Sequence, residues 1–173
     1  MLPSLTLVLG GAASGKSAFA ERLATSCGLG LIYLATAEVH DDEMKEKVIK
    51  HKEMRGNGWT TIEAPLDVGP ALAGASIDSI VLLDCATMWL SNHLLAEHDL
   101  KEAETDLIAA LHQTQARVIV VSNEVGMSVV PENRLARRFR NAQGALNQRL
   151  AAEADLVVNV VAGLPQVLKG DLP

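Results

Sequence analysis

Residues 5–17 decide the fold class of this chain, and they read Leu5-Thr6-Leu7-Val8-Leu9-Gly10-Gly11-Ala12-Ala13-Ser14-Gly15-Lys16-Ser17. The last eight match the phosphate-binding loop pattern G-x-x-x-x-G-K-[ST] at every fixed position, directly after an apolar run. A loop of small residues between a buried strand and a helix can turn its backbone N–H groups inward, where the helix N-terminus adds partial positive charge. The alternative is a glycine-rich turn that binds nothing. The strand–loop–helix context favours a nucleoside triphosphate site formed by Gly10, Gly11, Ala12, Ala13, Ser14, Gly15, Lys16 and Ser17.

Two side chains of the loop and two acidic residues elsewhere are candidates for phosphate binding, metal binding or general-base catalysis. Lys16 is expected to reach the β- and γ-phosphates, and the Ser17 hydroxyl to coordinate a Mg²⁺ that bridges phosphate oxygens. The apolar run 79–83 ends in Asp84, which is expected to hold this metal directly or through water; a strand-end cap is the alternative. Glu124 follows a second apolar run. It is a candidate general base or outer metal contact, and equally a solvated loop carboxylate.

The rest of the chain alternates apolar runs with helical stretches, which is typical of a parallel sheet covered by helices. Strands are expected near residues 5–9, 30–35, 78–83, 117–121 and 156–161, with a short candidate strand at 59–62. Helices are expected near residues 16–26, 41–55, 87–97, 101–115 and 132–152. We therefore predict an α/β fold of the P-loop NTPase type, with a mostly parallel sheet flanked by helices in a single domain over residues 1–173. Ligands of such sheets bind beyond the carboxyl ends of the strands.

The last expected helix carries an apolar stripe at spacings of three and four, which predicts its buried face. The stripe consists of Leu135, Phe139, Ala142, Leu146 and Leu150. After the final apolar run, Gly163 to Pro173 is expected to be a loose tail.

Composition excludes several classes of protein. The chain has 173 residues, 49% of them hydrophobic, and a formal net charge of −6, which argues against a general nucleic-acid binder. Two cysteines, Cys27 and Cys85, form neither a metal-binding spacing nor a disulfide framework. No secretory leader is recognisable, and no apolar run approaches the ~18 residues of a membrane span. We expect a cytoplasmic protein with no membrane segment.

The expected helix 41–55 presents one histidine among cations. Lys47, His51 and Arg55 recur every four residues, and Lys50 and Lys52 flank the histidine. Neighbouring positive charges lower the pKa of an imidazole, which keeps the ring neutral and nucleophilic. His51 is therefore a candidate nucleophile toward phosphorus. The alternative is a solvated basic face with a bystander histidine.

Five further short blocks of sequence follow the phosphate loop, and together with it they form a pattern that runs along nearly the whole chain, as far as Ala162. They are Tyr33-Leu34-Ala35-Thr36-Ala37, Asp41-Asp42-Glu43-Met44, His51-Lys52, Asn123-Glu124-Val125-Gly126-Met127 and Val130-Pro131-Glu132-Asn133-Arg134-Leu135-Ala136-Arg137. In this order and spacing the sequence resembles the bifunctional adenosylcobinamide kinase/adenosylcobinamide-phosphate guanylyltransferase family. The Asn-Glu-Val-Gly-Met and Val-Pro-Glu-Asn-Arg blocks are much more specific than the phosphate loop, which many unrelated families share.

The resemblance implies two reactions, with GTP and ATP as nucleotide substrates and Mg²⁺ as cofactor. A nucleoside triphosphate phosphorylates adenosylcobinamide, and GTP then donates GMP to adenosylcobinamide phosphate through a covalent guanylyl-histidine, at the position matched by His51. It also implies nucleotide contacts by Ala35, Thr36, Ala37, Lys52, Glu53, Met54, Arg55, Glu63 and Asp84, with Ser17 and Asp84 at the metal, and a homotrimer.

Two positions depart from the family pattern. The family often carries arginine where this chain has Ala13, so a phosphate contact from that side chain is absent. The family often carries glutamate where this chain has Asp84, and the shorter reach of aspartate favours water-mediated metal contact. A plain small-molecule kinase and a nucleotide-driven regulatory module are the alternative functions. Because the chain has five aromatic residues among 173, we expect the corrinoid to occupy an aliphatic groove between subunits.

Overall fold

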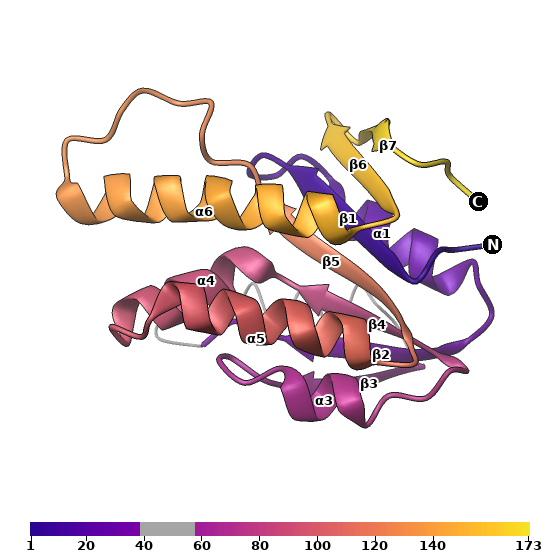
Figure 1. Cartoon of the computed structure of the whole chain (residues 1–173). Helices are drawn as coiled ribbons and strands as arrows, with labels where there is room; N and C mark the ends of the chain where they lie inside the picture. Colours follow the sequence, from indigo (N-terminus) through magenta and orange to yellow (C-terminus); the bar gives the residue numbers. More distant parts are fainter. Residues whose placement is uncertain (39–57) are drawn as a thin grey trace.

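The computed structural model describes residues 1–38 and 58–173, and these residues form one seven-stranded sheet in the order β3-β2-β4-β5-β1-β6-β7 (Figure 1). The strands are β1 (Leu5–Gly10), β2 (Gly30–Ala35), β3 (Trp59–Glu63), β4 (Ser79–Asp84), β5 (Arg117–Asn123), β6 (Leu156–Val161) and β7 (Leu164–Lys169). All neighbouring pairs are parallel except β6 and β7. The predicted α/β fold with a mostly parallel sheet is therefore confirmed.

Helices of the described residues cover both faces of the sheet. They are α1 (Lys16–Thr25), α3 (Gly69–Ala73), α4 (Ala86–Leu95), α5 (Leu100–Gln113) and α6 (Arg134–Glu153). One apolar core lies between the sheet and α3, α4, α5 and α6, which Figure 1 shows in front, and the other lies under α1. Because both faces are covered, the central strands β4 and β5 are buried along almost their whole length, which explains their continuous apolar runs. No helix among the described residues has the length and apolarity needed to cross a membrane.

The predicted strands all form, including the candidate at 59–62, which is β3. The predicted helix 41–55 lies outside the described residues. The short helix α3 was not predicted, because five residues are too few to show a helical period.

The loose tail predicted for Gly163 to Pro173 is wrong for most of its length, because residues 164–169 form β7. This strand pairs antiparallel with β6 through a tight turn at Ala162 and Gly163, whose φ angles are 52° and 78°. Two positive φ angles in succession are what a two-residue hairpin turn requires. Pro165 within the strand is compatible with its place at the edge of the sheet.

The apolar stripe predicted for α6 is buried only in its C-terminal half. Leu146 and Leu150 are buried and Phe139 and Ala142 pack against the same core, but Leu135 is 47% exposed. In Figure 1 the N-terminal end of α6 reaches past the other helices, so the stripe continues there without a surface to cover it.

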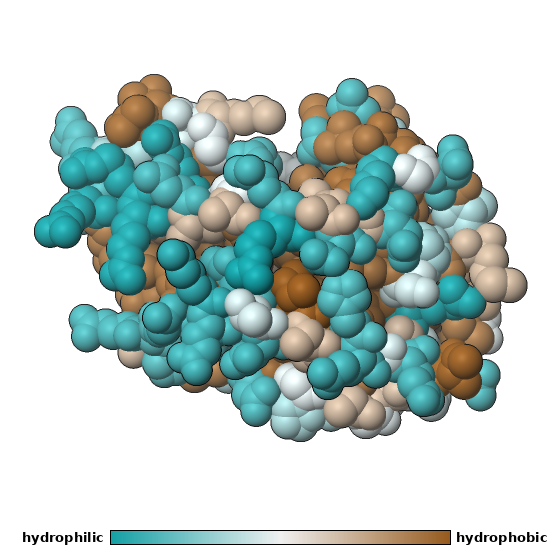
Figure 2. Space-filling view, viewed as in Figure 1, coloured by the Kyte–Doolittle hydropathy of each residue, from teal (hydrophilic) through white to brown (hydrophobic). Residues whose placement is uncertain are grey.

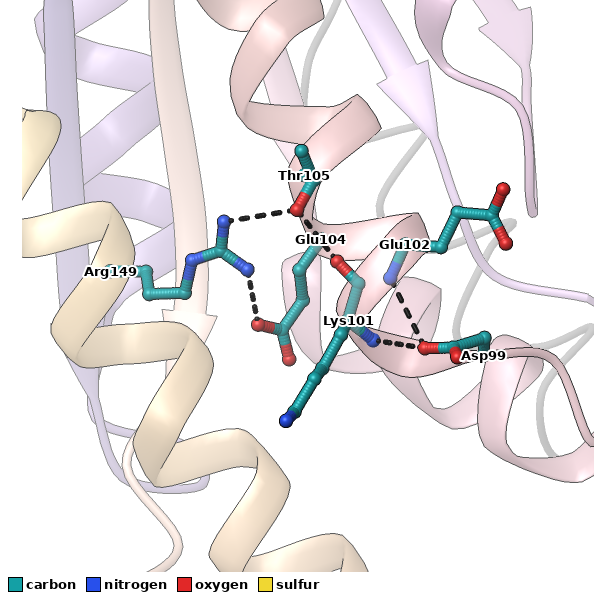
Figure 3. Close-up of polar contacts among 6 residues, drawn as sticks. All are labelled: Asp99, Lys101, Glu102, Glu104, Thr105 and Arg149. Carbon is teal, nitrogen blue, oxygen red and sulfur yellow. Dashed lines mark hydrogen bonds and ion pairs between the residues drawn. The ribbon is translucent and has the colours of Figure 1, made fainter.

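Polar contacts at the first turn of α5, and between α5 and α6, complete this layer (Figure 3). Asp99 caps α5 by accepting hydrogen bonds from two backbone N–H groups of its first turn, at 2.9 and 3.2 Å. Arg149 of α6 pairs with the buried Glu104 of α5 at 2.8 Å and donates to the Thr105 hydroxyl at 3.4 Å. The two contacts of Arg149 hold α5 against α6.

Candidate functional site

The loop between β1 and α1 has a compact, closely packed backbone. Gly15 has φ 89°, in the left-handed region that favours glycine, and Ala13 has φ 54°. A Cβ atom on Gly10 would overlap the Ser14 side chain and lie 2.7 Å from the Val160 carbonyl oxygen, so no side chain fits there. The glycines at both ends of the motif are therefore required by the conformation of the loop itself.

Lys16 begins α1, and its side chain turns back over the loop. Its Nζ donates to the Gly11 carbonyl oxygen at 3.0 Å. Burial lowers the pKa of Lys16, whereas Cys85 and Asp84 oppose this shift. The ammonium group therefore lies in a partly desolvated position within the influence of Asp84, where an electrostatic contact with a phosphate is stronger than in bulk water.

Asp84 ends β4, and one of its oxygens is engaged: the Tyr33 hydroxyl of β2 donates to Asp84 Oδ2 at 3.1 Å. The side chain is half-buried, as is Ser17 in the first turn of α1. Both residues offer oxygen ligands, which Mg²⁺ prefers, and Mg²⁺ is usually held by one or two protein oxygens together with phosphate oxygens and water. The donors at this edge of the sheet therefore suit the predicted metal.

Thr36 follows β2, and the structure places its side chain inside the protein. It is 0% exposed; its Oγ1 donates to the Cys85 carbonyl at 2.7 Å and accepts from the Cys85 N–H at 2.8 Å. The Asn92 side chain of α4 donates to the Thr36 carbonyl at 2.8 Å and to the Pro65 carbonyl at 2.9 Å. Thr36 thus joins the ends of β2 and β4, and the half-buried Ala35 and Ala37 beside it remain the predicted nucleotide contacts that can face a ligand.

The sheet register brings the remaining described candidates into one row. Ala35 pairs with Glu63 of β3 on one side and with Asp84 of β4 on the other, so the three lie side by side at the carboxyl ends of neighbouring strands. Glu63 is exposed there. The predicted residues His51, Lys52, Glu53, Met54 and Arg55 lie outside the described residues.

Glu124 is half-buried just beyond β5, where its backbone N–H donates to the Gly10 carbonyl at 3.0 Å. Its Oε1 accepts from the Gly126 N–H at 2.6 Å within the same turn. The contact favours the interpretation of Glu124 as a loop carboxylate that shapes its own segment.

A buried polar network behind the site was not predicted. Gln143 and Asn147 of α6 bond to each other and to the Ser122 hydroxyl at 2.7–2.9 Å, and Asn147 also donates to the Asn123 carbonyl at 3.0 Å. The Thr87 hydroxyl accepts from the Asn123 N–H at 2.8 Å. Two polar residues four apart, beside the apolar stripe of α6, are the signal that could have revealed it, because a buried amide needs a partner.

The fold and this edge of the sheet define a P-loop nucleotide-binding protein. The flagellar accessory protein FlaH from Methanocaldococcus jannaschii superposes with a TM-score of 0.54 at 15% identity, covering 98% of this chain and 80% of that one. A prototypical ATPase from the type III secretion system of pathogenic bacteria superposes with a TM-score of 0.58 at 11% identity, covering 96% of this chain and 58% of that one. At these identities the likeness concerns the fold alone.

Sequence comparison identifies the family. Residues 6–168 match the family described as cobinamide kinase / cobinamide phosphate guanyltransferase. The bifunctional adenosylcobalamin biosynthesis protein CobP of Pseudomonas aeruginosa is 42% identical over 95% of this chain and 97% of its own length. Its counterpart CobU of Salmonella typhimurium is 41% identical over 95% and 99%. The chain therefore belongs to the cobinamide kinase / cobinamide phosphate guanyltransferase family, a family of transferases.

Proposed function

We propose that this chain, as one domain over residues 1–173, carries out both transfers suggested by its family. In the first, a nucleoside triphosphate phosphorylates the hydroxyl of adenosylcobinamide. In the second, GTP donates GMP to the new phosphate, which yields adenosylcobinamide-GDP and pyrophosphate. The observation that carries this proposal is the family match over residues 6–168, which includes the phosphate loop and the His51 position.

The geometry of the described residues supports the nucleotide half of the proposal. Backbone N–H groups of residues 10–17 bind the phosphates, and Lys16 neutralises the charge that develops on the transferred group. Ser17 and Asp84 would hold Mg²⁺, which would stabilise the negative charge of the phosphates. Thr36 and Tyr33 keep the end of β4, and with it Asp84, in place.

The second transfer is proposed to proceed through His51. A neutral ring nitrogen attacks the α-phosphorus of GTP, a P–N bond forms, and the bond to pyrophosphate breaks. An oxygen of adenosylcobinamide phosphate then attacks the same phosphorus, and the P–N bond breaks to restore the histidine. Lys47, Lys52 and Arg55, close to His51 in sequence, neutralise phosphate charge during both steps.

Incubation with Mg²⁺ and GTP labelled on the α-phosphate tests this route. Label that remains on the denatured protein, is lost in acid, survives alkali and is missing from His51→Ala supports it. His112→Ala is the matched control, because that histidine is exposed and bonds to the exposed Glu153 at 2.8 Å, so this variant should label normally. A wild-type protein that gains no label would leave the plain-kinase alternative.

We further propose a homotrimer, with the corrinoid in an aliphatic groove between subunits. Exposed apolar side chains on two segments support a subunit interface: Leu164 and Leu168 on β7, and Met127 and Val129 in the loop before α6. Figure 2 shows apolar residues over both regions, at the upper right and the upper left. A monomer in light scattering would refute the trimer. The proposed setting is the cytoplasm, without nucleic-acid partners.

A further inference from the structure

The turn between β6 and β7 contacts the backbone of the phosphate loop. The Gly163 N–H donates to the Ser14 carbonyl oxygen at 2.8 Å. The two segments are so close that a Cβ atom on Gly15 would lie 3.1 Å from the Gly163 Cα. The C-terminal hairpin is therefore in direct contact with the loop predicted to bind nucleotide.

The contact determines the direction of one peptide group of the loop. The Ser14 carbonyl and the Gly15 N–H belong to the same planar peptide, and in a trans peptide these two groups point in opposite directions. Because the carbonyl points at Gly163, the Gly15 N–H points away from the hairpin. An N–H that points away from the hairpin is available to a phosphate bound by the loop.

The hairpin offers this N–H because of the conformation of its turn. Gly163 has φ 78°, and a Cβ atom there would meet no described atom within 4 Å. Glycine is thus favoured at this position by backbone conformation, with no steric limit on a side chain. A residue that resists positive φ would move the N–H away from Ser14 without creating an overlap.

We propose that Gly163 is a positioning residue for the phosphate loop, which acts through its hydrogen bond to Ser14 and aims the Gly15 N–H at the triphosphate. The inference rests on the proposed function in one respect, namely that this loop binds a nucleoside triphosphate. It assigns a part in nucleotide binding to a segment about 150 residues from the loop in sequence.

The chain provides a matched control for the test. Gly28, between α1 and β2, has φ 68°, and a Cβ atom there would also meet no described atom within 4 Å. Gly28→Val therefore imposes the same kind of backbone cost as Gly163→Val, but away from the phosphate loop. Gly163→Asn is the conservative variant, because asparagine adopts positive φ more readily than most residues and keeps the N–H.

The experiment measures the dissociation constant of a fluorescent GTP analogue with Mg²⁺, together with urea unfolding, for the full-length wild type and the three variants. In Gly163→Val the Gly15 N–H is no longer aimed at the triphosphate, so the dissociation constant of the analogue should rise about tenfold, the equivalent of one hydrogen bond to a charged group. Gly28→Val should bind within about twofold of wild type at a similar loss of stability, and Gly163→Asn should recover most of the affinity. If Gly163→Val fails to fold, Gly163→Ala and Gly28→Ala provide the same comparison at a lower backbone cost.

Two results would overturn the inference in distinguishable ways. Equal affinity of the Gly163 and Gly28 variants, with a wild type that binds, refutes the positioning role and leaves the proposed function intact. A wild type that does not bind the analogue refutes nucleotide binding by the loop, and the role of Gly163 with it.

Discussion

Replacing Thr36 by valine removes one hydroxyl and leaves the shape of the side chain almost unchanged. In the wild-type protein this hydroxyl satisfies both the N–H and the carbonyl of Cys85 at 2.8 and 2.7 Å, in a fully buried position. The Cys85 N–H is left without a partner, which costs about 1–3 kcal/mol, and the Cys85 carbonyl, which still accepts from the Trp89 N–H at 3.2 Å, loses one of two bonds at about 0.5–1.5 kcal/mol. Thr36→Val should therefore lose about 1.5–4.5 kcal/mol of the free energy of unfolding. That is a large share of the total for a domain of this size, typically about 5–15 kcal/mol.

Urea unfolding followed by circular dichroism measures this loss. With an m-value of about 2 kcal/mol per molar urea, the midpoint should fall by about 1–2 M at unchanged m. Thr36→Ser keeps the hydroxyl and loses a methyl group, which should cost about 1 kcal/mol. Thr61→Val, on the exposed part of β3, should change stability by less than about 0.5 kcal/mol. A Thr36→Val protein no less stable than Thr36→Ser would refute the reasoning, because the hydroxyl would then contribute nothing.

Three further predictions concern other parts of the fold. Asn133 caps α6 by accepting from two backbone N–H groups at 2.7 and 3.2 Å, so Asn133→Ala should cost about 1 kcal/mol in urea unfolding; no loss would contradict the cap. Burial raises the pKa of the Cys85 thiol to about 11, so a thiol reagent at pH 8 should modify Cys27 first and Cys85 only after denaturation; two fast equivalents would contradict this. Burial lowers the pKa of His93 below its unfolded value of about 6.5, so on acidification the unfolded state takes up the proton before the folded state does. The free energy of unfolding should therefore fall as the pH drops below about 6.5, by at most about 1.4 kcal/mol per pH unit. His93→Gln should flatten this part of the pH dependence, and parallel curves for the two proteins would count against it.

Short sequence patterns predicted an element correctly wherever the physical cause of its structure lies within the same segment. Residues 80–83 and 118–121, in the middle of β4 and β5, are buried on both faces, so their sequence is apolar throughout and each run can be recognised without knowledge of its neighbours. The phosphate loop is likewise recognisable, because its conformation needs glycine at Gly10 and Gly15 and its chemistry needs Lys16. The resemblance to the family added further candidate residues for nucleotide binding and transfer, and those at 51–55 lie outside the described part of the chain.

Expectations failed where the deciding contact joins distant segments. Leu135 continues the period of the α6 stripe, but its exposure depends on where the neighbouring helices end. Residues 164–169 carry a proline and no alternation, and they become a strand because β6 offers a free edge. Nothing local to Thr36 indicates that its hydroxyl bonds to Cys85, 49 residues further along.

The sequence by itself determined the class of fold, the phosphate loop and the family, because strand hydrophobicity, glycine conformations and specific blocks are properties of short segments. Only the tertiary structure decided which groups orient that loop. The Gly163 N–H in the hairpin reaches Ser14 because β6 lies next to β1 in the sheet. The sequence of a short segment does not show which strands will be neighbours. Strand order brings residues about 150 positions apart into contact, and the packing of the sheet, rather than either segment alone, sets the direction of the peptide between Ser14 and Gly15.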